Sequence, residues 1–192
     1  MSDDPAQKRS LKTLWLLVAL TVAPVASSYL LYYFWQPAHT VNYGELIEPH
    51  PLPDEKLALA DGAPFRMSQL KGRWALVTID AAACDANCER KLVYTRQLRL
   101  TQGKNMDRVE RVWLMTDAAA PNARAITEQP GLVAVRATPE LLAAFPAEPG
   151  AATNHIYLVD PLGNLMMRFP SNPDPKLMIK DLTRLLKASQ IG

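Results

Sequence analysis

The segment WALVTIDAAACDANCER, residues 74–90, decides the fold of this chain. It begins with a continuous apolar run over residues 74–79, which is typical of a strand buried at the centre of a sheet. Cys84 and Cys88, the only two cysteines of the chain, follow that run, and a helical pattern extends from Cys84 to about residue 101. A strand that passes into a helix places these thiols at a helix N-terminus, where the helix dipole and the free N–H groups favour the thiolate.

Downstream of this segment, strand-like and helix-like patterns alternate. We expect strands at residues 109–115, 132–135, 155–159 and 165–169, a loop with a short helix over 117–129, and helices at 139–145 and 176–188. The turn Asp160-Pro161-Leu162-Gly163-Asn164 joins the last two strands as a hairpin. This order predicts an α/β domain, a thioredoxin-like mixed sheet flanked by helices.

Upstream, residues 13–44 contain no Asp, Glu, Lys or Arg. The apolar part of this window is long enough, at about 1.5 Å per residue, to cross a hydrocarbon core of about 30 Å. Tyr and Trp residues gather near its far end, as an interfacial aromatic belt would. A cleaved signal peptide is the alternative, but cleavage would leave an apolar aromatic run at the new N-terminus. We therefore expect one N-terminal transmembrane helix, a single-pass anchor at residues 13–35.

The charges that flank this span predict its orientation. Three basic residues precede it, and the first charges after it are acidic. The positive-inside rule places residues 1–12 in the cytoplasm and the rest of the chain outside. In a bacterium this means an inner-membrane protein with a C-terminal domain in the periplasm, where cysteine pairs can oxidise.

Residues 36–60 resemble a tether, because the proline-rich patch at 49–53 favours a stiff, extended chain. His39 and His50 lie there and are expected to be solvated linker residues. The thioredoxin-like domain is expected to cover residues 61–192. A hydrophobic content of 48% and a net charge of +2, with no basic block beyond the N-terminus, indicate a globular domain that binds no nucleic acid.

The cysteine spacing allows two kinds of chemistry. Positions i and i+4 of a helix lie on one face, with Cβ atoms about 5–6 Å apart, so Cys84 and Cys88 can close a disulfide or hold a soft metal ion. A purely structural disulfide is an alternative, although so short a loop adds little stability through chain entropy. Two Cys and one His make a poor structural zinc site but a reasonable Cu(I) site.

His155 is the only histidine of the expected domain and stands at the entry to the strand at 155–159. In a thioredoxin-like fold, the loop before this strand approaches the start of the first helix. We therefore expect His155 to be a ligand or redox partner of the cysteines, the alternative being a histidine at a strand edge bonded to the backbone.

Together these motifs resemble the SCO family of membrane-anchored, thioredoxin-fold copper proteins that assist cytochrome c oxidase assembly. The resemblance rests on the N-terminal anchor, the Cys84-x-x-x-Cys88 motif and His155, together with three short sequences. Those are Asp61-Gly62-Ala63-Pro64-Phe65, Leu70-Lys71-Gly72-Arg73-Trp74 and Ile156-Tyr157-Leu158-Val159-Asp160-Pro161-Leu162-Gly163. It implies that Cys84, Cys88 and His155 bind one copper ion and that the protein is an assembly factor that helps load copper into cytochrome c oxidase. The implied partner is cytochrome c oxidase subunit II or another copper-site protein.

Two other functions stay open within this resemblance. Cys84 and Cys88 would be catalytic in a periplasmic thiol–disulfide oxidoreductase that keeps the oxidase copper-site cysteines reduced, and they would be inert in a non-catalytic anchored scaffold. Where the family carries Pro after each cysteine, this chain has Asp85 and Glu89, acids that would raise the thiol pKa values and could attract a cation. A plain thioredoxin is less favoured, because that class uses Cys-x-x-Cys and a proline at the strand entry occupied here by Asn154-His155.

Overall fold

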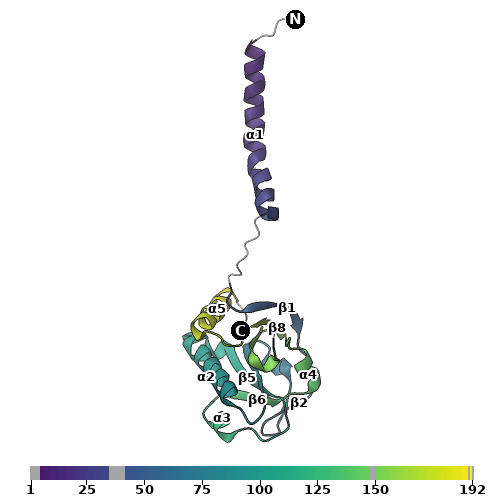
Figure 1. Cartoon of the computed structure of the whole chain (residues 1–192), viewed down its shortest axis with the longest axis vertical. Coiled ribbons are helices and arrows are strands. Elements are labelled where there is room, and N and C mark those ends of the chain that lie inside the picture. Colours follow the sequence, from purple (N-terminus) through teal and green to yellow (C-terminus); the bar gives the residue numbers. More distant parts are fainter. Residues whose placement is uncertain (1–4, 35–41, 148–149, 190, 192) are drawn as a thin grey trace. The chain divides into compact units, whose positions relative to one another are not determined.

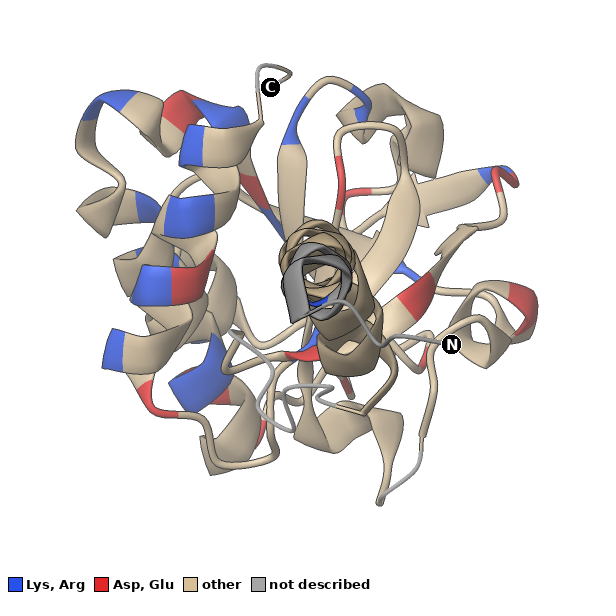
Figure 2. Ribbon diagram, turned by 90° about the horizontal axis from the view of Figure 1, so that it is seen from above, with Lys and Arg blue, Asp and Glu red and all other residues tan. Residues whose placement is uncertain are grey.

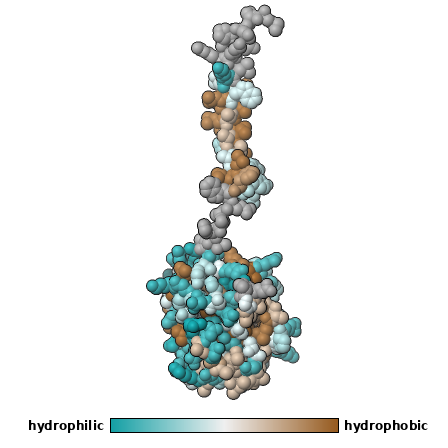
Figure 3. All heavy atoms as spheres, viewed as in Figure 1, coloured by the Kyte–Doolittle hydropathy of each residue, from teal (hydrophilic) through white to brown (hydrophobic). Residues whose placement is uncertain are grey.

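The computed structural model describes residues 5–34, 42–147, 150–189 and 191. The chain forms two compact units, residues 1–41 and 42–192. The first contains helix α1 (Pro5–Phe34), in which Lys12–Phe34 has a mean hydropathy of 1.9 and is, within the described residues, the one segment long and apolar enough to cross a membrane. Apolar side chains stand out on the coloured part of this helix, whereas the visible face of the second unit is mostly hydrophilic (Figure 3). The prediction of one N-terminal apolar helix is confirmed.

The second unit is built on one eight-stranded mixed sheet in the order β1-β8-β7-β4-β5-β6-β2-β3. Its central strand β4 (Trp74–Asp80) runs parallel to β5 (Val109–Met115), and β5 runs parallel to β6 (Leu132–Arg136). The hairpin of β7 (Ile156–Val159) and β8 (Asn164–Arg168) adds antiparallel strands on the other side of β4. This is the predicted thioredoxin-like mixed sheet.

Helices cover both faces of the sheet (Figure 1). On one face, α2 (Ala86–Thr101) and α5 (Pro175–Ala188) pack on Trp74, Leu76 and Leu158. On the other face, α4 (Pro139–Ala143) contributes Leu141 to a core with Ala75 and Val77. Since alternate residues of β4 enter opposite cores, all seven are buried, which explains the continuous apolar run in the sequence. A short helix, α3 (Ala123–Thr127), completes the set.

The structure differs from the predicted linker over residues 45–60. Strand β1 (Glu45–Pro51) pairs with β8 and forms one edge of the sheet, while β2 (Leu57–Leu59) lies between β6 and β3 (Pro64–Phe65) near the other edge. The interpretation of residues 36–60 as a tether missed β1 because prolines are tolerated on an edge strand, where an N–H can face away from the sheet, and it missed β2 because that strand is only three residues long. His39 lies outside the described residues.

His50 is a strand residue and not the solvated linker residue that we expected. Its Nε2 contacts the carbonyl of Ala144 at 3.0 Å and its Nδ1 contacts that of Glu48 at 2.9 Å. These two bonds, the larger effect coming from Ala144, raise the pKa of His50 above its usual 6.5. The histidine thus joins β1 to the end of α4.

The start of the second unit is fixed by a buried acid of α5. The side chain of Asp181, only 2% exposed, accepts hydrogen bonds from the backbone N–H groups of Tyr43 and Gly44 at 2.7 and 2.8 Å. A Cβ atom at Gly44 would lie 2.6 Å from the Met167 sulfur, so a larger residue at this position requires the Met167 side chain to move. The fold therefore begins close to residue 42 and not at the expected residue 61.

Candidate functional site

Cys84 and Cys88 form a disulfide, with their Cα atoms 5.1 Å apart. The i, i+4 argument predicted that both cysteines lie on one face of a helix. This prediction is wrong, because α2 begins only at Ala86 and Cys84 precedes it. Asp85 is the N-cap residue, and its Oδ1 accepts a hydrogen bond from the Cys88 N–H at 2.9 Å. The acid that replaces the expected proline after Cys84 therefore ends the loop and starts the helix.

Cys84 occupies an unusual backbone conformation. Its φ is +48°, and it is the only non-glycine residue with a positive φ in the described part of the chain. Its N–H donates to the carbonyl of Ala81 at 3.0 Å, which closes a tight turn directly after β4. A left-handed backbone costs a residue with a side chain of the order of 1 kcal/mol, and such strain is concentrated at functional sites.

The disulfide lies beside a pocket of about 320 Å³. Nine residues line this pocket: Asp80, Ala81, Ala83, Cys84, Asp85, Asn87, Thr116, Thr153 and Asn154. Cys84 is among them and is 4% exposed, while Cys88 is absent from the lining and fully buried. A partner that enters the pocket therefore meets the Cys84 side first.

A buried ion pair lies under this loop. Lys91 of α2, 3% exposed, donates from Nζ to Asp80 Oδ1 at 2.8 Å and to the Ile79 carbonyl at 3.2 Å, and it also donates to the Thr153 carbonyl. One side chain thereby holds together the end of β4, the start of α2 and the loop before β7. These are the walls of the pocket.

Burial changes the acidity of both members of the pair. Desolvation raises the pKa of Asp80 to about 6, against the opposing attraction of Lys91, and the nearby charge of Asp85 adds to the rise. Desolvation likewise lowers the pKa of Lys91, while Asp80 opposes that change. Asp80 thus carries the most perturbed carboxyl group beside the cysteines.

His155 stands at the end of the loop that reaches the cysteines. Its neighbours Thr153 and Asn154 line the pocket beside Cys84, but His155 does not. The ring is buried, 4% exposed, and Nδ1 lies 2.8 Å from the Phe169 carbonyl. Since a carbonyl only accepts hydrogen bonds, Nδ1 carries a proton in this contact, and a neutral ring then has its lone pair on Nε2.

The predicted three-ligand copper set is not assembled in this structure. Both sulfurs are consumed in the disulfide, and no group of three or more His, Cys, Asp and Glu residues in the described part of the chain is arranged to hold a metal ion. The chemistry of the individual donors nevertheless fits copper: thiolates and one imidazole suit Cu(I), and an Nδ1–H donated to a carbonyl is how metal-binding histidines are commonly oriented. Copper binding by Cys84, Cys88 and His155 stays a prediction for the reduced chain.

Sequence reasoning did not single out Asp80, Lys91 or Thr153. The sequence did offer one signal for Asp80, because a charged residue that directly ends an apolar strand is unusual enough to be a candidate site residue. The position of its partner on α2, eleven residues later, follows from the fold and not from a motif. The part of Thr153 is a backbone carbonyl, which no side-chain pattern reveals.

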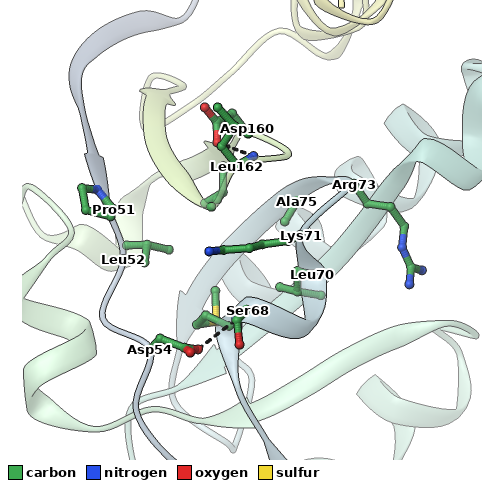
Figure 4. A pocket seen from close by; sticks show the side chains of 13 residues that line it. Pro51, Leu52, Asp54, Ser68, Leu70, Lys71, Arg73, Ala75, Asp160 and Leu162 are labelled. Atoms are coloured by element: carbon green, nitrogen blue, oxygen red, sulfur yellow. Dashed lines mark hydrogen bonds between the residues drawn. The ribbon is translucent and has the colours of Figure 1, made fainter. Parts of the chain in front are cut away.

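A second, smaller cavity lies at the opposite end of β4, where Lys71 extends between Leu52 and Leu70 (Figure 4). Asp54 accepts a hydrogen bond there from the Ser68 N–H at 3.0 Å. Asp160, on the same rim, uses its carboxylate within its own turn, where Oδ1 accepts from Leu162 and Asn164. Two cations and two acids are among the residues that line this cavity, and no cysteine or histidine lines it.

A family model described as transmembrane-like, thioredoxin-like, C-terminal domain matches residues 74–189, more than half of the 192-residue chain. The chain belongs to this family. The match covers β4, the disulfide and every later strand and helix of the sheet, so the transmembrane-like, thioredoxin-like domain includes both the cysteine pair and His155. No curated protein matches the sequence.

Solved structures of low sequence identity share this fold. Yeast Sco1 with copper bound has 17% identity and a TM-score of 0.60, with 74% of this chain and 96% of that chain covered. A thioredoxin-family thiol:disulfide interchange protein from Chlorobium tepidum has 22% identity and a TM-score of 0.52, covering 74% and 97%. BsSco is a member of the Sco family of cytochrome c oxidase assembly proteins in which a disulfide switch was identified. It has 12% identity and a TM-score of 0.54, with 76% of this chain and 99% of that chain covered. These structural matches show that the chain shares its fold with the three proteins.

Proposed function

We propose that this transmembrane-like, thioredoxin-like protein is a divergent member of the SCO family that acts on a copper-site protein by thiol–disulfide exchange through Cys84 and Cys88. The single observation that carries the proposal is the arrangement of the disulfide, with Cys84 on the wall of a pocket and Cys88 buried behind it. An attacking sulfur that faces a pocket and a second sulfur within bonding distance are the two parts that exchange requires.

The exchange reaction follows from this arrangement. In the reduced protein, the Cys84 thiolate attacks a disulfide of the partner, forms a mixed disulfide and releases one partner sulfur as a thiolate. The Cys88 thiolate then attacks Cys84 Sγ, which forms the intramolecular disulfide of this structure and frees the second partner sulfur. Two electrons pass to the partner, and a separate dithiol reductant restores the Cys84–Cys88 pair.

The fold relatives indicate the partner class. The Chlorobium tepidum relative is a thiol:disulfide interchange protein, and BsSco belongs to a family of cytochrome c oxidase assembly proteins. We therefore propose cytochrome c oxidase subunit II, or another protein whose copper-site cysteines must be reduced before loading, as the substrate. Incubating the reduced full-length chain with an oxidised copper-site domain should convert that domain to its dithiol form at a rate that needs both cysteines.

Copper delivery is the second candidate function, favoured by the copper-bound yeast relative. In this case the reduced Cys84 and Cys88 thiolates and the His155 ring hold one Cu(I) ion as cargo and pass it to the partner by ligand exchange. Titration of the reduced full-length chain should then show about one copper ion bound per chain, as the three-ligand set requires. His155→Ala separates the two functions, because it weakens copper binding but leaves exchange intact.

An inert scaffold is the remaining alternative. A Cys84→Ser/Cys88→Ser double variant that supports full oxidase assembly in cells would select it over both other functions. If that variant is folded and present in the membrane but assembly is lost, the cysteine pair is required for function and the scaffold alternative is excluded.

We infer that α1 anchors the domain to the inner membrane with its N-terminus in the cytoplasm and residues 42–192 in the periplasm. The support is the apolar stretch Lys12–Phe34 together with the basic residues before it and the acids after it. A domain on the periplasmic side also stands where a disulfide persists. Protease added to intact spheroplasts should degrade the domain, and protection of the domain would reverse the orientation.

A further inference from the structure

A pocket lined by three arginines lies away from the cysteines, on the face of the sheet that α2 covers. It measures about 340 Å³. The residues that line it are Arg96, Arg99, Leu100, Arg111, Pro130 and Gly131, three cations and no acid. Lys and Arg gather on this side of the domain, along α2 and α5 (Figure 2).

Arg111 forms the buried wall of this pocket. It is 1% exposed, and its guanidinium donates to Gln129 Oε1 at 2.9 Å and to the Pro130 carbonyl at 2.6 Å. Both partners are neutral, and within the described residues the Arg111 Nε has no hydrogen-bond acceptor. A buried cation held only by neutral groups is costly, because desolvation of the charge is not compensated by a counter-charge.

The neighbouring charges increase this imbalance. Burial first, and then the positive charges of Arg99 and Arg96, lower the pKa of Arg111 to about 10, and Glu110 opposes the change. The acids nearby are engaged elsewhere: Glu110 pairs with Arg73, and Glu128 pairs with Arg124 at 2.7 Å. Asp107, which is largely exposed, reaches one arm of Arg99 at 3.3 Å.

A β-turn holds the guanidinium in place through one side-chain acceptor and one backbone acceptor. Gln129, Pro130, Gly131 and Leu132 form a β-turn, closed by the Leu132 N–H donating to the Gln129 carbonyl at 3.1 Å, with Gly131 at φ +74°. Proline followed by glycine at positive φ is the sequence that a type II turn requires. Since this turn supplies both acceptors of Arg111, the cation is oriented before any ligand arrives.

We propose that Arg96, Arg99 and Arg111 form a binding site for a phosphate-type oxyanion. Planar guanidinium groups match the oxygens of phosphate in pairs, and three cations attract a phosphate oxyanion both as a dianion and as the monoanion of a diester. Free phosphate and a phospholipid headgroup share this chemistry. This pocket shares no lining residue with the pocket beside the cysteines, so the proposal does not depend on the exchange and copper functions.

The test uses the full-length chain in phosphatidylcholine nanodiscs, titrated with inorganic phosphate by calorimetry. We expect saturable binding that weakens about tenfold or more in Arg96→Gln, because one charge-assisted contact is lost. Arg96 is exposed, and its one hydrogen bond within the described residues goes to the Glu128 carbonyl, so this variant keeps the fold. Arg90→Gln is the matched control, since it removes an exposed arginine of the same helix that does not line the pocket.

A second arm distinguishes the two sources of phosphate. If lipid headgroups occupy the site, phosphatidylglycerol added to the nanodiscs competes with inorganic phosphate and weakens its apparent affinity in the wild type but not in Arg96→Gln. Unchanged affinity assigns the site to free phosphate. The proposal is overturned if the wild type shows no saturable phosphate binding, or if Arg90→Gln weakens binding as much as Arg96→Gln does.

Discussion

Lys91 donates a hydrogen bond to Asp80 at 2.8 Å, and both side chains are almost completely buried beneath the Cys84–Cys88 loop. The same ammonium also binds the Thr153 carbonyl, so the pair joins the strand, the helix and the loop that surround the disulfide. We regard Lys91 as the positioning residue of the site. The stability and the acidity of this pair lead to the first two predictions.

Lys91→Met should lower the free energy of unfolding by about 3–5 kcal/mol, because it leaves the Asp80 carboxylate buried without its partner. Urea denaturation followed by tryptophan fluorescence measures the change. The double variant Asp80→Leu/Lys91→Met removes both charges and should recover most of the loss. Equal losses in the single and double variants would show that packing, and not the charge pair, sets the cost.

The acidity of Asp80 predicts a specific pH dependence. Its pKa is raised from 3.8 to about 6, so the folded state holds this proton more tightly than the unfolded state does. The resulting contribution to stability is fully present below about pH 3.8 and is lost as the pH rises through about 6. The stability of the wild type relative to Asp80→Asn should therefore fall between pH 4 and pH 6 and level off above. A difference that stays flat over this range would contradict the raised pKa.

Asp85→Ala should cost about 1 kcal/mol through loss of the N-cap of α2. Asp85→Asn keeps an acceptor for the Cys88 N–H and should cost much less. Asp174→Ala is a control at a distant helix. It removes the equivalent N-cap of α5, where Asp174 accepts a hydrogen bond from the Lys176 N–H at 2.8 Å. All three values come from denaturation curves. An Asp85→Asn variant as unstable as Asp85→Ala would mean that the charge matters and not the cap.

His50 should titrate above 6.5, because its ring binds the carbonyls of Ala144 and Glu48. A raised histidine pKa adds stability that is fully present below the unfolded pKa and disappears as the pH rises through the folded pKa. His50→Gln should therefore lose more stability at pH 5.5 than at pH 8. NMR titration of the ring protons gives the pKa directly. A pKa at or below 6.5 would contradict the two hydrogen bonds and indicate a solvated ring.

Much of the fold was predictable from local patterns. The apolar runs at residues 74–79 and 109–115 correspond to β4 and β5, because strands covered on both faces are apolar throughout. The apolar spacing of residues 176–188 likewise identified α5. The strand at 45–51 was missed, since an edge strand with Pro49 and Pro51 lacks both alternation and a continuous apolar run. The strand at 57–59 was missed because three residues are too few to show a pattern.

The site was predictable only in part. The disulfide and the approach of the 152–154 loop agree with expectation, since Thr153 and Asn154 line the pocket beside Cys84. The helical placement of Cys84 was wrong, because Asp85 is the N-cap and the helix begins at Ala86, two residues later than predicted. The Asp80–Lys91 pair depends on tertiary packing of β4 against α2, which no local pattern specifies.

The most direct test of the central claim is trapping of the exchange intermediate. The Cys88→Ser and Cys84→Ser variants of the full-length chain are each reduced and mixed with an oxidised copper-site domain, and the products are identified by mass spectrometry. Because Cys84 lines the pocket and Cys88 is buried behind it, Cys88→Ser should accumulate a mixed disulfide through Cys84, whereas Cys84→Ser should form little or none. No adduct in either variant, or an adduct only through Cys88, would contradict the account.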